Sequence, residues 1–216
     1  MQFIDLSHTI SSGMPVFPGS AEVKTEITAF LESHRYNEKL LHLSTHTGTH
    51  IDCAKHLVKH GFDTAGALPE KFYGRGIVID CRDEIKNGII NVSCVRKYEN
   101  EIRHTDFVLI YTGWYHHWGT SVYTGNSPVP GTDIANYLAG FKLKGAGIDT
   151  MSMDNINSFD LPVHHILLSR EMVLVENLTN LESLPVSGFH FCCFPLKIED
   201  GDGSPVRAIG LINNTT

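Results

Sequence analysis

HTGTHIDCAKH, residues 46–56, places three histidines and one aspartate within eleven residues. Its two threonines are β-branched and its glycine is a weak helix former, so the stretch favours a strand. Side chains alternate between the two faces of a strand, which would put His46, His50 and Asp52 on the same face. Gly48, on that face too, would leave room between them.

Two imidazoles and a carboxylate on one face form a donor set suited to a divalent metal, with zinc and manganese the expected ions. A helix would also bring His46 and His50 together, as in H-E-x-x-H sites, but it would turn Asp52 to another side. The alternative is a polar sheet face with surface histidines, because His42 and Ser44 are an even number of residues from His46 and would lie on the same face. Spacing alone favours the metal site.

Composition restricts the class of protein. The 216 residues are 42% hydrophobic and 19% charged, which fits one well-buried core and excludes a disordered chain. A formal charge of −7 argues against nucleic acid or an anionic membrane as the main partner. No apolar run reaches the length of a membrane span, and residues 1–10 do not have the pattern of a secretion signal.

The five cysteines lack C-x-x-C spacing, so they do not predict a zinc knuckle or a disulfide framework. Reduced thiols and a cytoplasmic location are expected. Cys53 follows Asp52 directly, but it falls on the opposite face of the predicted strand. We therefore expect Cys53 to pack in the core rather than act as a nucleophile.

Alternating apolar strands and helices predict the fold class. Buried strands are expected at 76–80, 107–111, 146–149, 172–176 and 188–197, with helices at 92–101, 132–143 and from 164 onward. This alternation of strands and helices indicates one α/β domain over residues 1–216, with a mixed, partly parallel sheet and flanking helices. Strands at 3–8, 23–30 and 40–52 would form a second sheet or hairpin packed on it.

Residues 46–56 also resemble the H-x-G-T-H-x-D-x-P-x-H signature of the cyclase family of metal-dependent hydrolases, which includes bacterial kynurenine formamidases and isatin hydrolases. The one departure is Ala54, which stands where the family has proline. It changes backbone stiffness but removes no ligand. The resemblance extends to three further segments: T-G-W at 112–114, V-E-N-L at 175–178 and D-G-S-P-V-R at 202–207. It implies a swivelling β/β/α fold.

The resemblance implies a second pair of metal ligands, His164 and Glu176, twelve positions apart in an H-x-x-L-L…V-E-N-L context. His165 does not fit that interval. From the residues alone, Glu176 could equally be a strand-end carboxylate capped by backbone N–H groups. In the scheme that the resemblance implies, His46, His50 and Asp52 hold one metal, and Asp52, His164 and Glu176 hold a second.

The resemblance also assigns His56 as an acid–base group beside the metal; the alternative is a surface histidine in a polar run. Phe17, in the proline-containing loop 13–19, is the candidate aromatic wall of the substrate site, although the loop could be a plain turn. The aromatic loop 115–130 is long enough to be functional and is expected to close over the substrate. Asp149 and Asp154 are expected to cap or orient neighbours.

The expected activity is hydrolysis of the C–N bond of a small amide, an N-formyl arylamine or a lactam by a metal-activated water, with one or two zinc or manganese ions per chain. Alternatives are a lactone hydrolase or cyclase on the same metal site, a non-catalytic metal-binding protein, and a structural domain whose histidines only titrate. The expected partners are a small-molecule substrate and further copies of the chain, as a homodimer or homotetramer.

Overall fold

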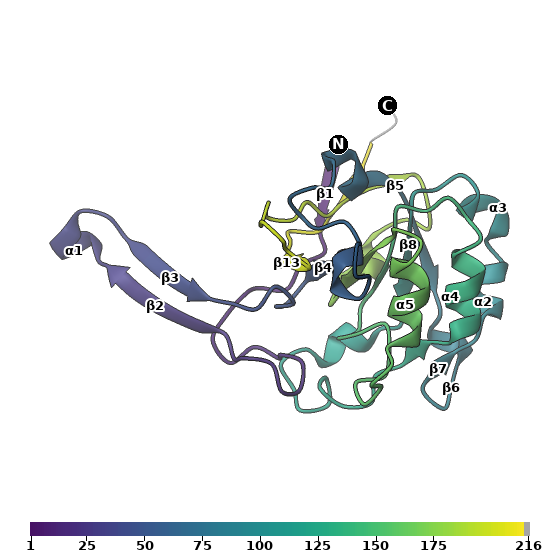
Figure 1. The fold of residues 1–216 in the computed structure, drawn as a ribbon, viewed down its shortest axis with the longest axis horizontal. Helices are drawn as coiled ribbons and strands as arrows, with labels where there is room; N and C mark the ends of the chain where they lie inside the picture. Colours follow the sequence, from purple (N-terminus) through teal and green to yellow (C-terminus); the bar gives the residue numbers. More distant parts are fainter. Residues whose placement is uncertain (214–216) are drawn as a thin grey trace.

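A nine-stranded sheet organises the computed structural model, which describes residues 1–213 (Figure 1). Its strands, in spatial order, are β1 (Gln2–Asp5), β14 (Ile209–Ile212), β12 (Phe189–Cys192), β5 (Tyr73–Asp80), β8 (Phe107–Tyr111), β10 (Gly145–Ile148), β11 (Val173–Glu176), β4 (His50–Asp52) and β13 (Gly203–Pro205). The four central strands β5, β8, β10 and β11 are parallel, and the strands outside them pair antiparallel. The predicted single α/β domain with a mixed sheet is confirmed.

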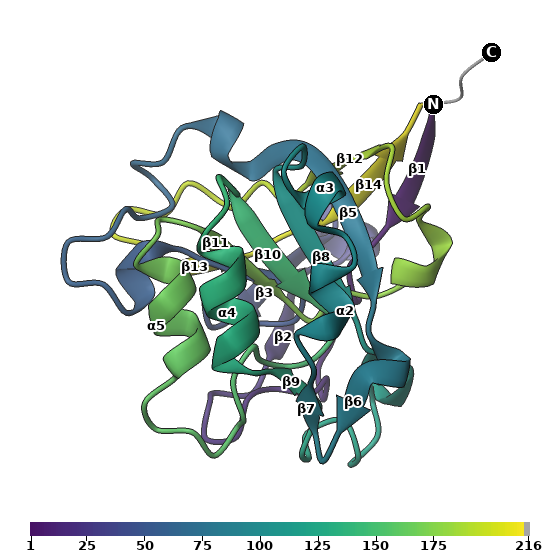
Figure 2. The same cartoon turned by 90° about the vertical axis from the view of Figure 1, so that its right-hand side faces the viewer.

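The helices cover one face of the central strands (Figure 2). They are α2 (Ser93–Arg96), α3 (Glu99–Ile102), α4 (Thr132–Leu138) and α5 (Pro162–Leu168). The chain also forms short 3₁₀ helices, η1 (Ala54–His56), η2 (Pro69–Phe72), η3 (Arg82–Glu84), η4 (Trp114–His117) and η5 (Leu181–Ser183), of which η2, η4 and η5 contribute Phe72, Tyr115 and Leu181 to the core on the opposite face. Alternate strand residues feed two cores: Ile77, Ile79 and Leu174 pack under the helices, while Val78 and Val175 pack on the other face. Both faces are therefore buried, which explains the continuous apolar runs.

Two small sheets complete the fold. One pairs β6 (Ile85–Lys86), β7 (Ile89–Ile90) and β9 (Val129–Pro130). The other pairs β2 (Lys24–Ala29) with β3 (Glu38–His42) through the short helix α1 (Leu31–His34). The second corresponds to the predicted N-terminal hairpin, but the expectation that it packs on the main sheet is wrong: it projects away from the body (Figure 1). The strand expected at 3–8 and the end of the strand expected at 40–52 belong to the main sheet, as β1 and β4.

Several predicted elements are shorter or divided in the structure, including the strand expected at 188–197, of which only Phe189–Cys192 form β12. The strand expected at 40–52 is interrupted, because Gly48 has φ +61, in the left-handed region, and only His50–Asp52 remain in β4. The helix expected at 92–101 divides into α2 and α3, and the helix expected to reach residue 143 ends at Leu138.

Within residues 1–213, the structure contains no helix with the length and apolar character needed to cross a membrane.

Glycines in β10 allow its neighbours to approach closely. A Cβ on Gly145 would lie 2.6 Å from the Val173 carbonyl oxygen, and a Cβ on Gly147 would lie 2.7 Å from Leu178 Cδ1. The first contact is with backbone in the adjacent strand, which cannot move without disturbing the ladder between β10 and β11. Gly145 is therefore required by the spacing of the central sheet.

We predict that Gly145→Ala lowers the free energy of unfolding by about 1–3 kcal/mol, because the added methyl group overpacks the sheet. Urea unfolding followed by circular dichroism measures the change. Gly140→Ala is the matched control, since its Cβ would meet only the Tyr137 carbonyl oxygen, at 3.2 Å. Equal stability of Gly145→Ala and wild type would contradict the prediction.

Candidate active site

The pairing of β4 with β11 places the first three side chains of the site. His50 lies opposite Glu176 in the antiparallel register, and Asp52 lies opposite Leu174. All four therefore share one face of the sheet, the face covered by α5, while Ile51 points into the other core. His50, Asp52 and Glu176 are each less than 5% exposed.

Helix α5 brings in His164 from above this face. Asp154 accepts hydrogen bonds from the backbone N–H groups of Val163 and His164 at the start of the helix. The same carboxylate accepts from His164 Nδ1 at 2.7 Å, so it fixes both the helix end and the imidazole ring. The expectation that Asp154 orients a neighbour agrees with this geometry, and Asp149 likewise accepts from Thr112 and Gly113.

The imidazole nitrogens that face the carboxylates are potential ligand atoms. His50 Nδ1 donates to the Gly48 carbonyl, and His164 Nδ1 donates to Asp154, so each ring directs its Nε2, the atom that would supply a lone pair to a cation, toward the carboxylates. His50 Nε2 lies 3.3 Å from Asp52 and 3.5 Å from Glu176; His164 Nε2 lies 3.4 Å and 3.1 Å from the same two carboxylates. Four electron-pair donors thus converge in a buried space. The chemistry of this set fits a divalent cation.

The charges in this cluster also favour a bound cation. Burial alone would raise the pKa of Asp52, but hydrogen bonds from His164, His46 and His50 hold that pKa well below 3.8. Burial would lower the pKa of His164, but the carboxylates of Glu176, Asp154 and Asp52 hold it well above 6.5. The field that favours a proton on His164 also favours a metal cation at its Nε2.

His46 reaches the cluster from outside the strand, so the predicted alternation from His46 to Asp52 is wrong in this part. Its ring lies between two carboxylates, with Nδ1 2.6 Å from Asp52 and Nε2 2.9 Å from Asp202. Burial lowers the pKa of His46, but these two carboxylates outweigh it and raise the pKa to about 9. Gly203 is required at this point, because a Cβ there would lie 2.8 Å from His46 Cε1.

His56 lies in η1, with its ring centroid 4.3 Å from that of His46. Its Nδ1 is 3.3 Å from the carboxylate of Asp202, which it shares with His46. Possible ligand atoms lie within 4.8 Å of one another in two groups: His46, Asp52 and His56, and His50, Asp52 and Glu176. Asp52 belongs to both groups, as expected for a shared carboxylate, but His56 joins the first group where His50 was expected.

Asp202 and Asn177 are the site residues that sequence reasoning did not single out. Asp202 belongs to the D-G-S-P-V-R segment, whose return toward the site was expected only through the family resemblance. Asn177 Nδ2 donates to the Gly48 carbonyl at 3.0 Å, and its Oδ1 accepts from Tyr123 at 2.7 Å. It therefore supports the turn that carries His50. The position of Asn177 directly after Glu176 is the sequence feature that could have identified it as a site residue.

A cavity of about 250 Å³ opens onto the cluster. Phe17, Pro15 and Val16 form one wall, as predicted for the proline-containing loop, and Met151 and Leu161 contribute further apolar surface. Residues 115–130, in the part of the chain that the structure describes, supply no lining side chain to this cavity. Trp118 instead stacks on His8, with ring centroids 3.7 Å apart. The expectation that this loop closes over the cavity is therefore not met.

Cys53 behaves as expected for a packing residue. Its side chain is buried on the face opposite the ligands. Burial and the nearby carboxylates of Asp52, Asp63 and Asp202 raise the pKa of its thiol to about 12. A thiol held in this form is a poor nucleophile.

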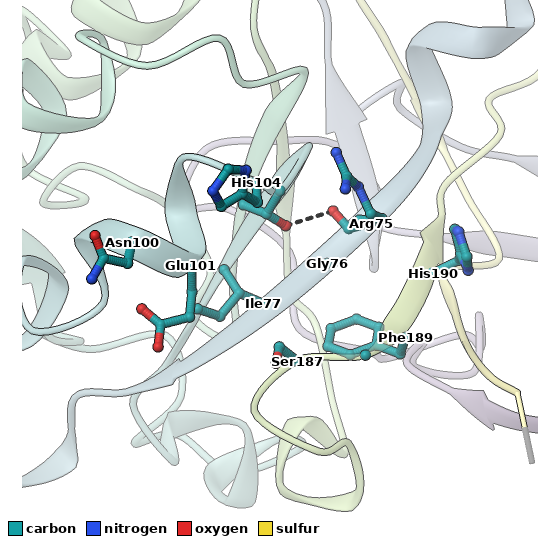
Figure 3. A pocket seen from close by; sticks show the side chains of 11 residues that line it. Arg75, Gly76, Ile77, Asn100, Glu101, His104, Ser187, Phe189 and His190 are labelled. Carbon is teal, nitrogen blue, oxygen red and sulfur yellow. Dashed lines mark hydrogen bonds between the residues drawn. The ribbon is translucent and has the colours of Figure 1, made fainter. Parts of the chain in front are cut away.

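A larger groove, of about 510 Å³, lies between β5, α3 and β12 (Figure 3). Arg75, Glu101, His104 and His190 are spread along it and do not point toward a common centre. The hydrogen bond drawn there joins the Thr105 hydroxyl to the Arg75 carbonyl oxygen. Volume alone does not identify an active site, and the convergence of titratable groups assigns that role to the smaller cavity.

The model of the Cyclase family matches residues 4–155 of this chain. A kynurenine formamidase from Salinibacter ruber is 31% identical over 221 residues, covering 97% of each chain. A kynurenine formamidase from Bacillus cereus is 27% identical and covers 96% of each chain.

Solved structures share the fold. Isatin hydrolase A from Labrenzia aggregata, bound to benzyl benzoate, is 26% identical with a TM-score of 0.87, covering 98% of this chain and 93% of that one. A second isatin hydrolase, bound to the product analogue thioisatinate, has a TM-score of 0.89 at 24% identity, covering 99% and 93%. The family model and the similarity along almost the whole chain agree with the predicted resemblance. This chain belongs to the cyclase family.

Proposed function

We propose that this protein is a metal-dependent hydrolase that cleaves the C–N bond of a small N-formyl arylamine, or of a lactam related to it. The observation that carries the proposal is the convergence of His50, His164, Asp52 and Glu176 beside a cavity with a partly apolar wall. Support for the substrate class comes from the names of the similar proteins, kynurenine formamidase and isatin hydrolase.

The residues that would hold the cation are His46, His50, Asp52, His164 and Glu176. We propose zinc or manganese, with one or two ions per chain, because imidazole and carboxylate ligands suit both metals. When bound, a divalent cation lowers the pKa of a water molecule toward ~7 and polarises a carbonyl oxygen. The imidazole and carboxylate groups are already oriented by Gly48, Asp154 and the sheet register, so little reorganisation is needed.

Two groups of this chain, the apolar wall and His56, would then act on the substrate, and Asp202 would position His56. The wall of Phe17, Pro15 and Val16 would pack against the aromatic ring and set the carbonyl carbon over the cluster. His56 would take a proton from the attacking water and return it to the departing nitrogen. Water adds to the carbonyl carbon and the C–N bond breaks, which gives a carboxylic acid and a separate amine from an N-formyl arylamine, or one ring-opened product that carries both groups from a lactam. Asp202 would hold His56 through Nδ1.

We further propose that the enzyme works in the cytoplasm on a free small molecule, without nucleic acid or a membrane partner. The formal charge of −7 supports this, since polyanions would be repelled. A panel of formylkynurenine, isatin and aryl lactones tests the substrate class. Turnover of the lactones alone would replace amide hydrolysis with lactone hydrolysis or cyclase chemistry on the same site.

We predict that tag-free wild-type protein keeps a divalent metal after dialysis and that Asp52→Ala and Glu176→Ala lose most of it. Each substitution removes a buried carboxylate that faces two imidazoles. Elemental analysis per chain gives the metal content, with Asp160→Ala, an exposed carboxylate, as the control. Wild-type protein that binds neither zinc nor manganese would overturn the proposed function.

We predict that His56→Ala reduces kcat by about 10²–10⁴-fold while the metal content stays near that of wild type, because the side chain moves a proton. His60→Ala, in the same polar run but exposed, serves as the control. Steady-state kinetics and elemental analysis are both required. Loss of metal from His56→Ala would make His56 a ligand, as its grouping with His46 and Asp52 allows.

We predict that Asp202→Asn lowers kcat or metal affinity by about 10–100-fold, because it removes the carboxylate that orients both His46 and His56. A positioning role predicts a fall in kcat with little change in KM. Asp200→Asn is the matched control: Asp200 is exposed and pairs with Lys55. If both variants matched wild type in kcat and metal content, the positioning role would be ruled out.

A further inference from the structure

The aromatic loop, residues 115–130, lies outside the cavity lining, but one of its side chains reaches a residue beside the ligand cluster. Tyr123 is fully buried, and its hydroxyl donates to Asn177 Oδ1 at 2.7 Å. Burial raises the pKa of Tyr123 well above 10, so the hydroxyl keeps the proton that it donates. The loop therefore brings a hydrogen-bond donor to the residue that directly follows Glu176.

Asn177 connects Tyr123 to the turn that precedes β4. Its Nδ2 donates to the Gly48 carbonyl at 3.0 Å, and the same carbonyl accepts from His50 Nδ1 at 2.8 Å. Thr49, between Gly48 and His50, donates through its hydroxyl to the Asn177 carbonyl at 2.6 Å. The turn at 48–50 is thus held by both the side chain and the backbone of Asn177.

The amide of Asn177 has one orientation that satisfies both of its neighbours. Asn177 and Gly48 both have a left-handed backbone, with φ +55 and +61, which asparagine tolerates better than most residues. A half-turn of the amide would exchange Oδ1 with Nδ2 and set two acceptors, Oδ1 and the Gly48 carbonyl, against each other. The Tyr123 proton favours the observed orientation from the other side. Without that hydroxyl, the amide is held at one end only.

Tyr123 is itself held by the aromatic loop and by the N-terminal segment. Trp118 stacks on His8 with ring centroids 3.7 Å apart and meets the Tyr123 ring edge-on at 4.9 Å. Trp114 Nε1 donates to the Tyr123 carbonyl at 3.1 Å. The His8 N–H group donates to Thr49 Oγ1 at 2.9 Å, so the same segment also contacts the turn. The Tyr123 hydroxyl therefore has a fixed position from which it can orient Asn177.

We propose that Tyr123 is a positioning residue for the metal ligand His50 and that it acts through Asn177. The proposal rests on the proposed function, because it takes His50 as a ligand of the cation. The Gly48 carbonyl holds His50 Nδ1 and thereby points Nε2 toward the buried carboxylates. Loss of a partner that orients a ligand ring lowers metal affinity by about 10–100-fold. The aromatic loop thus serves the site by orienting a ligand rather than by covering the cavity.

Zinc affinity tests the proposal, measured on metal-depleted protein by competition with a chromophoric chelator. We expect Tyr123→Phe, which removes only the hydroxyl, to raise the zinc Kd by about 10-fold, and Asn177→Gly to raise it by about 10–100-fold. Glycine keeps the left-handed backbone at 177, so only the amide is lost. Tyr115→Phe is the matched control: this loop tyrosine donates its hydroxyl to Glu182 instead and should keep the wild-type Kd.

A double-mutant cycle separates an effect through Asn177 from two independent effects. If Tyr123 acts through Asn177, the variant Tyr123→Phe/Asn177→Gly should have the zinc Kd of Asn177→Gly alone. Multiplication of the two single losses would overturn the proposal, because Tyr123 would then act by another route. A folded Tyr123→Phe variant with the wild-type zinc Kd would overturn it as well.

The His50 ring gives a readout that needs neither zinc nor turnover. Its buried Nδ1–H group, bonded to the Gly48 carbonyl, should give a downfield proton NMR signal in metal-free protein that exchanges slowly with water. We expect this signal to be lost through faster exchange in Tyr123→Phe and to remain in Tyr115→Phe.

The NMR experiment also separates this proposal from the proposed function. An unchanged His50 signal in Tyr123→Phe would overturn the positioning role, whether or not wild type binds zinc. Wild-type protein that binds no zinc but shows the expected loss of signal in Tyr123→Phe would support the orientation of His50 by Tyr123 and count against the proposed function alone.

Discussion

Two carboxylates buried against two imidazoles are the constraint on which the site depends. Asp52 and Glu176 are almost fully buried, with ligand atoms of His50, Asp52 and Glu176 within 4.8 Å of one another. Buried carboxylates are costly unless they meet cations or hydrogen-bond donors. The surrounding structure offsets part of this loss of hydration: Glu176 accepts a hydrogen bond from the Met153 N–H group, and Asp154 fixes the ring of His164. A divalent cation supplies the remaining positive charge.

The sheet determines how closely these groups can meet. Strands β4 and β11 are antiparallel neighbours, so a single register sets His50 opposite Glu176. The parallel strands behind them are buried on both faces and held close by the glycines of β10. A rigid sheet places His50, Asp52 and Glu176 through a short ligand strand next to its edge strand β13, and helix α5 places His164. Loops supply His46 and the apolar lining, which includes Phe17, Met151 and Leu161.

The projecting hairpin of β2, α1 and β3, residues 24–42, is an arm that follows a different principle from the body. The central sheet buries its large apolar side chains in the two cores, whereas the arm exposes large apolar side chains to solvent. Its root leads through Leu43 and Ser44 into His46, so the arm is continuous with the ligand-bearing stretch.

The sequence by itself determined the buried strands β5, β8 and β11, because continuous apolar runs indicate burial on both faces, and it also predicted the strand β10. It indicated His46, His50 and Asp52 as metal donors, because imidazole and carboxylate chemistry can be read from residue identity, whereas His164 and Glu176 followed only from the family resemblance. Tertiary structure alone decided how these donors are grouped. His46 lies outside the strand because Gly48 takes a left-handed φ, and Asp202 reaches His46 from 156 residues away. Periodicity describes neighbours along one strand, and it contains no information on contacts made by distant segments or on the direction in which the arm projects.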